Sequence, residues 1–358
     1  MAAASPTRAG PGEMDPERLP DEMSEVTVLS FDAISIDETK LLGKGAFSSV
    51  YEGTLTTASA GPIPVAIKKM RIPAAVSKDH KYLQTELRVL SGLTHRNLVK
   101  YFGLAKDDTH AFIVTELMRG GDLRAVLEGA IASGDPEAAF PTGLRLKVAQ
   151  DIAAGIDYMH NNEIVHRDIK TENVLMDEDW RPVLADYGFA RKVSAKKNMT
   201  IVGTDEFMAP EVIWGEAYDE RADVFSFGVV MAELFSWKRA GEDGFMTRTP
   251  RGKFRLDRDQ VSSAIREGTP DAPERLAELI LECLAYEPDD RVESADALAT
   301  LGEVLEEWSE THGGAEAGAG HSRRPSSVAR ERKAGDASAE AAAAASTPEA
   351  SPEAEEEG

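Results

Sequence analysis

Hydrophobic and polar positions change their spacing from one segment of the chain to the next. Short apolar runs bounded by glycine or polar residues predict strands over 40–42, 49–51, 65–68 and 111–115. Leu83, Leu87 and Leu90 repeat at the spacing of one helix face, so residues 77–93 are predicted to form a helix. A similar run over 276–284 predicts another helix near the end of the patterned region.

Composition separates the two ends of the chain from its centre. Residues 1–30 are rich in Pro, Ala and Glu without periodicity, and the residues after Thr311 are mainly Ala, Gly, Ser and Glu. We therefore expect disordered segments over 1–33 and over the acidic, low-complexity stretch 312–358. The segment 34–311 shows no internal repeat and is expected to be one folded unit.

Charge and cysteine content limit the classes of function. The 358 residues carry a formal net charge of −23, which argues against nucleic acid as a partner because phosphate binding draws on excess Lys and Arg. Cys283 is the only cysteine, so an internal disulfide is excluded, and a buried structural thiol is favoured over a redox role. No run of 18 apolar residues occurs, and no apolar signal core begins the chain, so we expect no membrane insertion and a cytoplasmic location, with a nuclear one left open.

Four short motifs occur in an order that points to phosphoryl transfer. The sequence HRDIKTEN spans 166–173, VAIK ends at Lys68, DYG begins at Asp186 and APE ends at Glu211. Lys68 precedes Asp168 by 100 residues, Asn173 follows Asp168 by five, and Asp186 follows it by 18. Together they supply a proton acceptor, oxygen ligands for a divalent cation and a cation for phosphate.

On these motifs the chain resembles a protein kinase over residues 36–310. The resemblance implies an α+β, bilobal protein kinase fold: an N-lobe, about 36–117, with an antiparallel β-sheet and one helix, and a mainly helical C-lobe, about 118–311. It implies ATP and Mg²⁺ as cofactors, with Mn²⁺ as an alternative, and protein substrates. The run that begins at Met208 and the segment 218–228 look like the tyrosine-kinase-like group, nearest to the LIM-domain and testis-type kinases.

The nucleotide site is expected between the lobes. Gly43 and Gly45 lie at a predicted hairpin tip, where backbone amides can approach phosphate, whereas a dinucleotide-binding loop would open a helix. Lys68 lies on an apolar strand and needs a partner, for which Glu86 is the candidate; a solvated Glu86 is the alternative. The resemblance implies an adenine pocket guarded by Thr115, with ordinary core packing as the other interpretation. Its remaining members are Leu42, Val50, Ala66, Glu116, Met118 and Leu175.

The resemblance also assigns the chemistry. Asp168 is expected to take the proton of the incoming hydroxyl, and Asn173 and Asp186 to bind the metal ion. Lys170 would neutralise the transferred phosphate and is typical of kinases specific for serine and threonine. Tyr187 replaces the usual Phe, and Ser48 the third loop glycine, but neither change removes a catalytic group. An ATP-binding pseudokinase scaffold and a small-molecule kinase remain as alternatives.

Regulation is expected at the segment that leads from Asp186 to Glu211. Arg167 next to the catalytic Asp marks kinases that are switched by phosphorylation of this loop, and Thr200 is predicted as the principal site, modified by an upstream kinase or by the enzyme itself. A solvated basic loop is the alternative. Thr204 is expected to contact Asp168 and Lys170, and its role is expected to be structural rather than regulatory.

Three further features concern the scaffold and the surface. Glu211 is expected to pair with Arg291, and Asp223 to brace the catalytic loop. Residues 238–258 hold seven basic and three acidic groups, which suggests either an exposed insert or a docking surface for an acidic or phosphorylated partner. Sites in the C-terminal stretch that suggest phosphorylation are Ser326, Ser327, Thr347 and Ser351. The sequence leaves the physiological substrate and the oligomeric state open.

Overall fold

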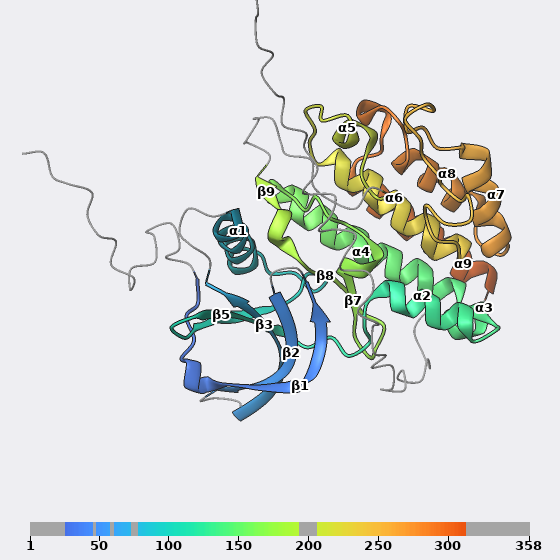
Figure 1. Cartoon of the computed structure of the whole chain (residues 1–358). Helices are drawn as coiled ribbons and strands as arrows, with labels where there is room; N and C mark the ends of the chain where they lie inside the picture. Colours follow the sequence, from blue (N-terminus) through green and yellow to red (C-terminus); the bar gives the residue numbers. More distant parts are fainter. Residues whose placement is uncertain (1–25, 46–47, 58–60, 73–77, 193–205, 313–358) are drawn as a thin grey trace, which may run out of the picture.

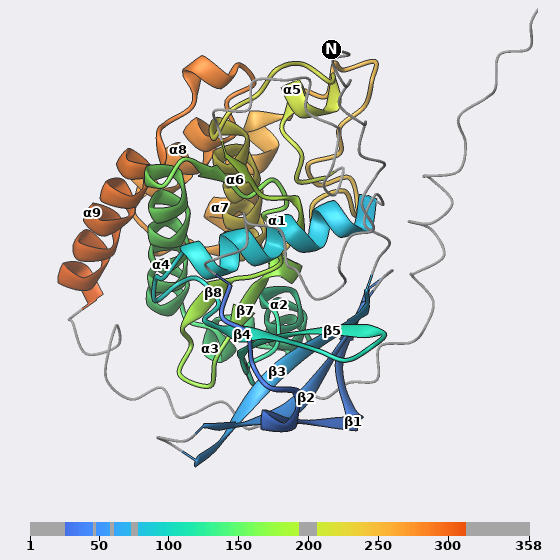
Figure 2. The same cartoon turned by 90° about the vertical axis from the view of Figure 1, so that its left-hand side faces the viewer.

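The computed structural model describes residues 26–45, 48–57, 61–72, 78–192 and 206–312, and within them it shows two lobes (Figure 1). The first lobe holds an antiparallel sheet with the strand order β1-β2-β3-β5-β4. The strands are β1 (Ile34–Lys44), β2 (Ser48–Thr57), β3 (Gly61–Arg71), β4 (Tyr101–Lys106) and β5 (His110–Glu116), and the helix α1 (Lys78–Gly92) lies between β3 and β4 in the chain. Figure 2 shows α1 crossing beside the sheet on the side of the second lobe.

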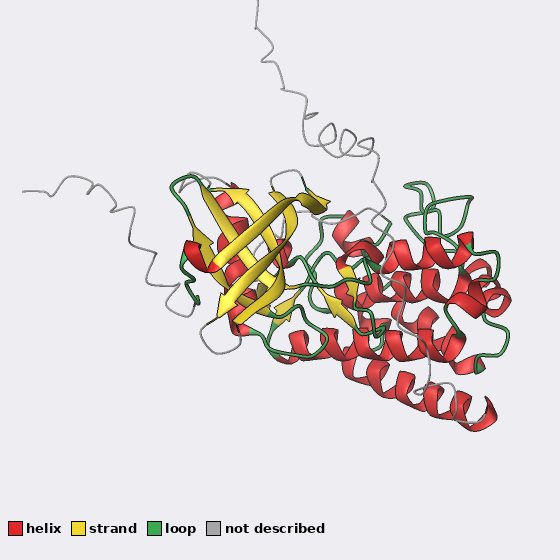
Figure 3. Cartoon of the chain, turned by 90° about the horizontal axis from the view of Figure 1, so that it is seen from below, coloured by secondary structure: helices red, strands yellow, loops and turns green. Residues whose placement is uncertain are grey.

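The second lobe is mainly helical (Figure 3). Its helices are α2 (Leu123–Ala132), α3 (Pro136–Ala139), α4 (Thr142–Asn161), α5 (Pro210–Ile213), α6 (Arg221–Ser236), α7 (Arg258–Gly268), α8 (Glu274–Cys283) and α9 (Ser294–His312). Two short strand pairs lie next to the first lobe: β7 (Val174–Met176) with β8 (Pro182–Leu184), and β6 (Ile164–Val165) with β9 (Arg191–Lys192). The predicted α+β, bilobal fold is confirmed.

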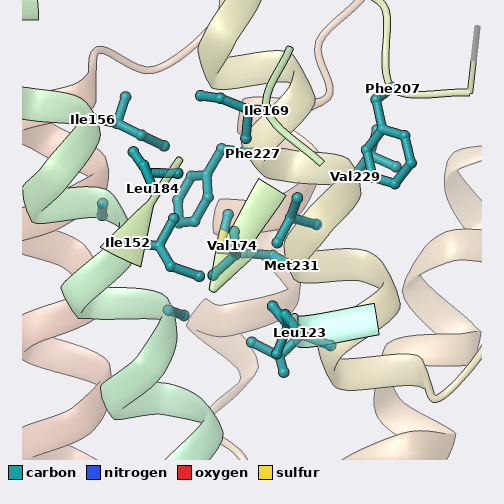
Figure 4. Close-up of a cluster of buried hydrophobic side chains, with 14 of the residues drawn as sticks. Leu123, Ile152, Ile156, Ile169, Val174, Leu184, Phe207, Phe227, Val229 and Met231 are labelled. Atoms are coloured by element: carbon teal, nitrogen blue, oxygen red, sulfur yellow. The ribbon is translucent and has the colours of Figure 1, made fainter. Parts of the chain in front are cut away.

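Helix α6 is the centre of the second lobe. Every residue from Ala222 to Ser236 is buried, as expected for a helix that is surrounded by other elements on all sides. Phe227, Val229 and Met231 on α6 pack with Ile152 and Ile156 of α4 in the large core cluster (Figure 4). This helix therefore offers a rigid base for the loops that cross it.

Alternation along β3 determines which side chains face the other lobe. Val65 and Ile67 are completely buried in the small core of the sheet. Because successive side chains of a strand point to opposite faces, Ala66 and Lys68 lie on the other face. The strand thus separates the residues that hold the sheet together from those predicted to meet the nucleotide.

The lobes are joined by backbone hydrogen bonds as well as by the connection after β5. The segment before β4 pairs with β8: Leu184 N donates to Asn97 O at 2.9 Å, and Val99 N donates to Leu184 O at 3.0 Å. The buried Asn97 side chain adds a hydrogen bond from its Nδ2 to Pro182 O at 3.0 Å. Residues 97–99, which precede β4, are therefore hydrogen-bonded to the second lobe.

Residues 26–33 were expected within the disordered N-terminal segment, but they lie along the edge strand β4. Leu104 N donates to Thr27 O and Leu29 N donates to Leu104 O, both at 2.8 Å. The Phe31 ring lies 5.1 Å from that of Phe112. An edge strand has unpaired backbone groups, which explains why this short stretch adds to it.

Two further expectations can be compared with the described residues. Cys283 is fully buried, and burial raises the pKa of its thiol, consistent with a structural role. No helix in the described part of the chain is long and apolar enough to cross a membrane.

Candidate active site

The catalytic loop forms a closed set of polar contacts around Asp168. The Nδ2 of Asn173 donates to Asp168 Oδ2 at 2.8 Å and to Asp168 O at 2.7 Å. The ammonium of Lys170 lies 3.2 Å from Asp168 Oδ2. Burial raises the pKa of the Asp168 carboxyl, and the nearby Lys170 opposes this increase. The predicted proton acceptor therefore has a fixed orientation and a basicity above that of an exposed aspartate.

Asp223 of α6 braces this loop from below, as expected. Its carboxylate accepts from the backbone N–H of His166 at 2.7 Å and of Arg167 at 2.8 Å, and it lies 3.0 Å from His160 Nε2. Arg167 has a φ of 72°, a left-handed conformation that costs energy for a residue with a side chain. The two hydrogen bonds to a buried carboxylate hold the loop in this strained form.

Lys68 and Glu86 form the expected ion pair between β3 and α1. Lys68 Nζ lies 2.7 Å from Glu86 Oε1 and 2.9 Å from Oε2, and it is 3.5 Å from Asp186 Oδ1. Burial alone would lower the pKa of the Lys68 ammonium, but Glu86 and then Asp186 outweigh it and raise that pKa. Lys68 therefore stays charged at the boundary between the lobes.

Asp186 and Asn173 fit the predicted cation site. Lys68 lowers the pKa of the Asp186 carboxyl, which therefore remains ionised. Because Asn173 Nδ2 is used by Asp168, its amide oxygen is the atom that could ligate a cation. Within the described ranges no group of three or more His, Cys, Asp and Glu side chains could hold a metal. Two oxygen ligands suit a cation that takes its other ligands from phosphate and water.

The Tyr187 side chain takes the place expected for the aromatic residue of this motif. Its ring is 2% exposed and lies 5.3 Å from that of His166, and α1 packs on the short turn that it begins. The hydroxyl, which needed a partner, donates to Leu184 O at 2.7 Å. The Tyr replacement is therefore accommodated without an unpaired polar group.

The glycine loop is the predicted hairpin tip. It joins β1 to β2, and Gly45 N donates to Ser48 O at 2.9 Å, while residues 46–47 lie outside the described part. Gly43 has open space around the position of a side chain. Leu42, at the end of the same strand, is 47% exposed. A β-hairpin, and not a helix, carries these glycines.

The predicted adenine residues come from both lobes. The strand registers place Val50 beside Lys68 and Ala66 beside Thr115. Leu175 comes from β7 of the second lobe and bridges to Asp122. These positions lie around the connection between the lobes, where a planar ring could be covered from both sides.

The side chain of Glu116 shows a contact that the sequence did not indicate. Its Oε1 accepts from Lys100 N and its Oε2 from Arg181 Nη2, both at 2.7 Å, and its own N–H donates to Lys100 O at 2.9 Å. Arg181 also donates to Arg96 O at 2.8 Å and lies 3.8 Å from the sulfur of Met118. Glu116 and Met118 are thus held in place by a residue at the edge of β8 that has no local sequence signal.

The regulatory residues are only partly described. Thr200 and Thr204 lie outside the described residues. Arg167 Nε donates to the hydroxyl of Tyr218 at 2.6 Å, and its Nη1 donates to Phe189 O at 3.1 Å. Sequence reasoning missed Tyr218, whose position beside Arg167 depends on the path of the chain between them.

Two buried ion pairs stabilise the second lobe near the site. Arg291 binds Glu211 with two contacts of 2.6 Å, as expected. Arg124 binds Glu233 of α6 with both carboxylate oxygens and lies 3.4 Å from Glu172 in the catalytic loop. The second pair was not predicted, because only the fold brings α2 against α6.

Comparison with known proteins agrees with this geometry. The family model described as "Protein kinase domain" matches residues 36–301. A probable serine/threonine-protein kinase of Dictyostelium discoideum is 34% identical over 279 residues, which cover 76% of this chain and 62% of that protein. The probable serine/threonine-protein kinase kinX of the same organism is 35% identical over 275 residues, covering 75% of this chain and 23% of kinX.

A third relative is the RasGEF domain-containing serine/threonine-protein kinase X of Dictyostelium discoideum. It is 33% identical over 271 residues, which cover 75% of this chain and 26% of that protein. The chain thus spans less than two thirds of each of these relatives. The match extends over both lobes and includes every residue of the site described above. The chain belongs to the protein kinase family.

Proposed function

We propose that this chain is a protein kinase that transfers the γ-phosphate of ATP to serine or threonine hydroxyls of protein substrates. The observation that carries the proposal is the Lys68 to Glu86 contact of 2.7 Å, made while Asp186 also lies within 3.5 Å of Lys68. The nucleotide-binding lysine and the metal-binding carboxylate therefore occupy one site. The presence of Lys68, Asp168, Asn173 and Asp186 in the chain argues against a pseudokinase scaffold.

The residues divide the reaction between them. The Asp168 carboxylate accepts a hydrogen bond from the substrate hydroxyl and takes its proton as the oxygen attacks the γ-phosphorus. The bond from that phosphorus to the leaving oxygen breaks, and its electron pair stays on ADP. Lys68 binds the α- and β-phosphates, while Lys170 offsets charge on the transferred group.

A divalent cation, which we propose to be Mg²⁺, would be held by Asp186 and Asn173. When bound, it would neutralise the negative charge that develops on the phosphate oxygens. Oxygen ligands alone favour this ion, with Mn²⁺ as the alternative.

The test is phosphate transfer by the purified full chain. Labelled ATP, Mg²⁺ and a basic protein acceptor are incubated with the wild type and with Asp168→Asn, and the labelled residues are mapped. We expect label on Ser or Thr and a loss of at least about 1,000-fold in the variant, because the proton acceptor is removed. ATP binding, followed by thermal shift, should be retained. Nucleotide binding without transfer by the wild type would instead support a scaffold.

We also propose that phosphorylation of Thr200 activates the enzyme. A phosphate adds nearly two negative charges, which Arg167 and Arg191 could bind with charge-assisted hydrogen bonds. Arg167 now donates to Tyr218 and Phe189, so the phosphate would compete for a guanidinium with existing partners. Thr200→Ala should lose more than half of the activity, and a loss of less than half, or the absence of phosphate at Thr200 in active enzyme, would count against this mechanism.

Two finer assignments rest on sequence alone. The segment 218–228 supports placement in the tyrosine-kinase-like group near the LIM-domain and testis-type kinases. Matched peptides that differ only in Ser, Thr or Tyr as acceptor would show whether Tyr is also used. A cytoplasmic location is a further proposal, and imaging of a fluorescent fusion would test it.

A further inference from the structure

We propose that the connection between α6 and α7 carries a docking surface for an acidic segment of the protein substrate, formed by Arg251, Lys253 and Arg255. The inference rests on the proposed kinase function and specifies the substrates that this site would favour. The basic composition of 238–258 suggested either docking or an exposed insert, and the structure shows how this connection is attached.

The connection is fixed to the segment that leads into α5, and Figure 1 shows its gold trace in the same outer part of the lobe as α5. A side chain at Gly241 would come within 2.8 Å of Glu206 Cγ, so the Glu206 side chain packs against this glycine. Arg248 Nη1 donates to Met208 O at 2.6 Å. The connection therefore lies beside Glu206 and Met208, at the end of the segment that leads from Asp186 to Glu211.

Aromatic contacts anchor the far end of the connection. The Phe254 ring lies 5.1 Å from that of Trp214, which directly follows α5, in an edge arrangement. The Trp214 Nε1 donates to the hydroxyl of Tyr286 at 3.2 Å. Such pairs give stability beyond their buried area, and they prevent this part of the connection from moving away from the second lobe.

The turn that carries the basic residues is held in a strained conformation. Phe254 N donates to Thr249 O at 2.9 Å and Lys253 N donates to Pro250 O at 3.0 Å. Lys253 and Phe254 have φ angles of 54° and 57°, a left-handed conformation that costs energy for residues with a side chain. Strain of this kind persists only where the surroundings enforce it. The turn therefore directs Phe254 against Trp214 and leaves its charged neighbours exposed.

The exposed groups suit carboxylates. Arg251, Lys253 and Arg255 are all exposed, and the Arg255 guanidinium lies 3.9 Å from the centre of the Tyr286 ring, which limits its orientations. Glu287 lies 3.9 Å from Arg255, and its side chain is 63% exposed, so it competes only weakly in water. The basic turn would attract acidic segments locally, although the net charge of −23 on the whole chain repels them.

The experiment uses the full chain and its charge-reversed variant R251E/K253E/R255E. A serine peptide that the wild type phosphorylates is extended by a run of glutamates or by an equal run of glutamines. Binding of the labelled peptides is measured by fluorescence anisotropy without ATP, and transfer is measured as KM and kcat. The control is R71E/R96E/K106E, which makes the same charge change at exposed positions of the first lobe.

We expect the glutamate peptide to bind the wild type and the control at least about tenfold more tightly than the glutamine peptide, with a correspondingly lower KM. This advantage should disappear in R251E/K253E/R255E and decrease with added salt, while kcat for the glutamine peptide stays unchanged. Equal affinities for both peptides, or an equal loss in the control, would overturn the proposal. Binding that occurs only after deletion of 313–358 would also overturn it, because the acidic end of the chain would then be the occupant.

The two proposals can fail separately. If no peptide or protein is phosphorylated but the glutamate peptide binds, the kinase proposal fails and the surface remains. If transfer is efficient but indifferent to the acidic extension, the kinase proposal stands and the docking surface is refuted.

Discussion

Replacement of Glu86 by Gln tests the electrostatic arrangement around Lys68. With an effective dielectric constant of about 20, the contact of 2.7 Å corresponds to an attraction on the order of 6 kcal/mol, and the 3.5 Å contact with Asp186 to on the order of 5 kcal/mol. Asp186 therefore keeps Lys68 protonated in the variant. The variant removes the negative charge of Glu86, whose side chain is only 7% exposed, and so Lys68 loses its nearest charged partner.

The expected cost has two parts. Leaving a buried charge with less compensation should lower the free energy of unfolding by about 3 kcal/mol, which corresponds to a decrease in Tm of roughly 6 to 12 °C. Lys68 should also turn toward Asp186 and lose its position for the phosphates, so kcat/KM for ATP should fall by about 100-fold. Thermal unfolding and steady-state transfer measure the two effects.

Glu38→Gln is a matched control, because Lys69 Nζ lies 2.7 Å from Glu38 Oε1 and Lys69 belongs to the same strand as Lys68. Here the side chains are 29% and 64% exposed, and water screens the pair. Neither Tm nor kcat/KM should change measurably. If Glu86→Gln retained wild-type kcat/KM, or if both variants lost the same stability, the argument that burial gives the Lys68 pair its importance would be refuted.

Three further substitutions address the scaffold. Glu211→Gln leaves the buried Arg291 without its charged partner and should reduce the free energy of unfolding by about 3 kcal/mol in urea denaturation, whereas a loss below about 1 kcal/mol would contradict the role of this pair. Tyr187→Phe removes the side-chain donor to Leu184 O, which still accepts from Val99 N, and should cost no more than about 1 kcal/mol while kcat stays near wild type; a large decrease in kcat would show that the hydroxyl has another role. Asp223 now accepts hydrogen bonds from two backbone N–H groups, and Asp223→Asn turns an amide N–H toward one of them. The catalytic loop should lose support, so kcat should fall at least about tenfold while the affinity for ATP stays unchanged. An unaltered kcat would show that Asp223 does not support the catalytic loop.

Sequence reasoning succeeded where a short motif has a fixed local geometry. A lysine on an apolar strand was expected to need a partner, and the helix pattern around Glu86 supplied one for the partly buried Lys68. The hairpin of Gly43 and Gly45 follows from the strands on either side of it. The family resemblance supplied the pairing of Glu211 with a distant arginine, which no local pattern contains.

Contacts between segments far apart in the chain could not be predicted in this way. Arg181 is an ordinary residue at the start of a short strand, and only the folded chain brings it to Glu116. The same holds for Tyr218 beside Arg167, and for Arg248 at Met208 O. Each depends on the direction of a long side chain after the backbone has folded, and composition and periodicity carry no information on it.

The pairing of residues 97–99 with β8 has a mechanical consequence for access to the nucleotide site. Two links, this pairing and the connection after β5, attach the first lobe to the second along one side, and Arg181 ties both of them together through Arg96 O and Glu116. A sliding displacement of the lobes would break these hydrogen bonds, whereas a rotation about the line that joins them would preserve them. Opening of the nucleotide site should therefore be a hinge rotation about this line, with the largest displacement at the opposite edge of the sheet, which carries the glycine hairpin.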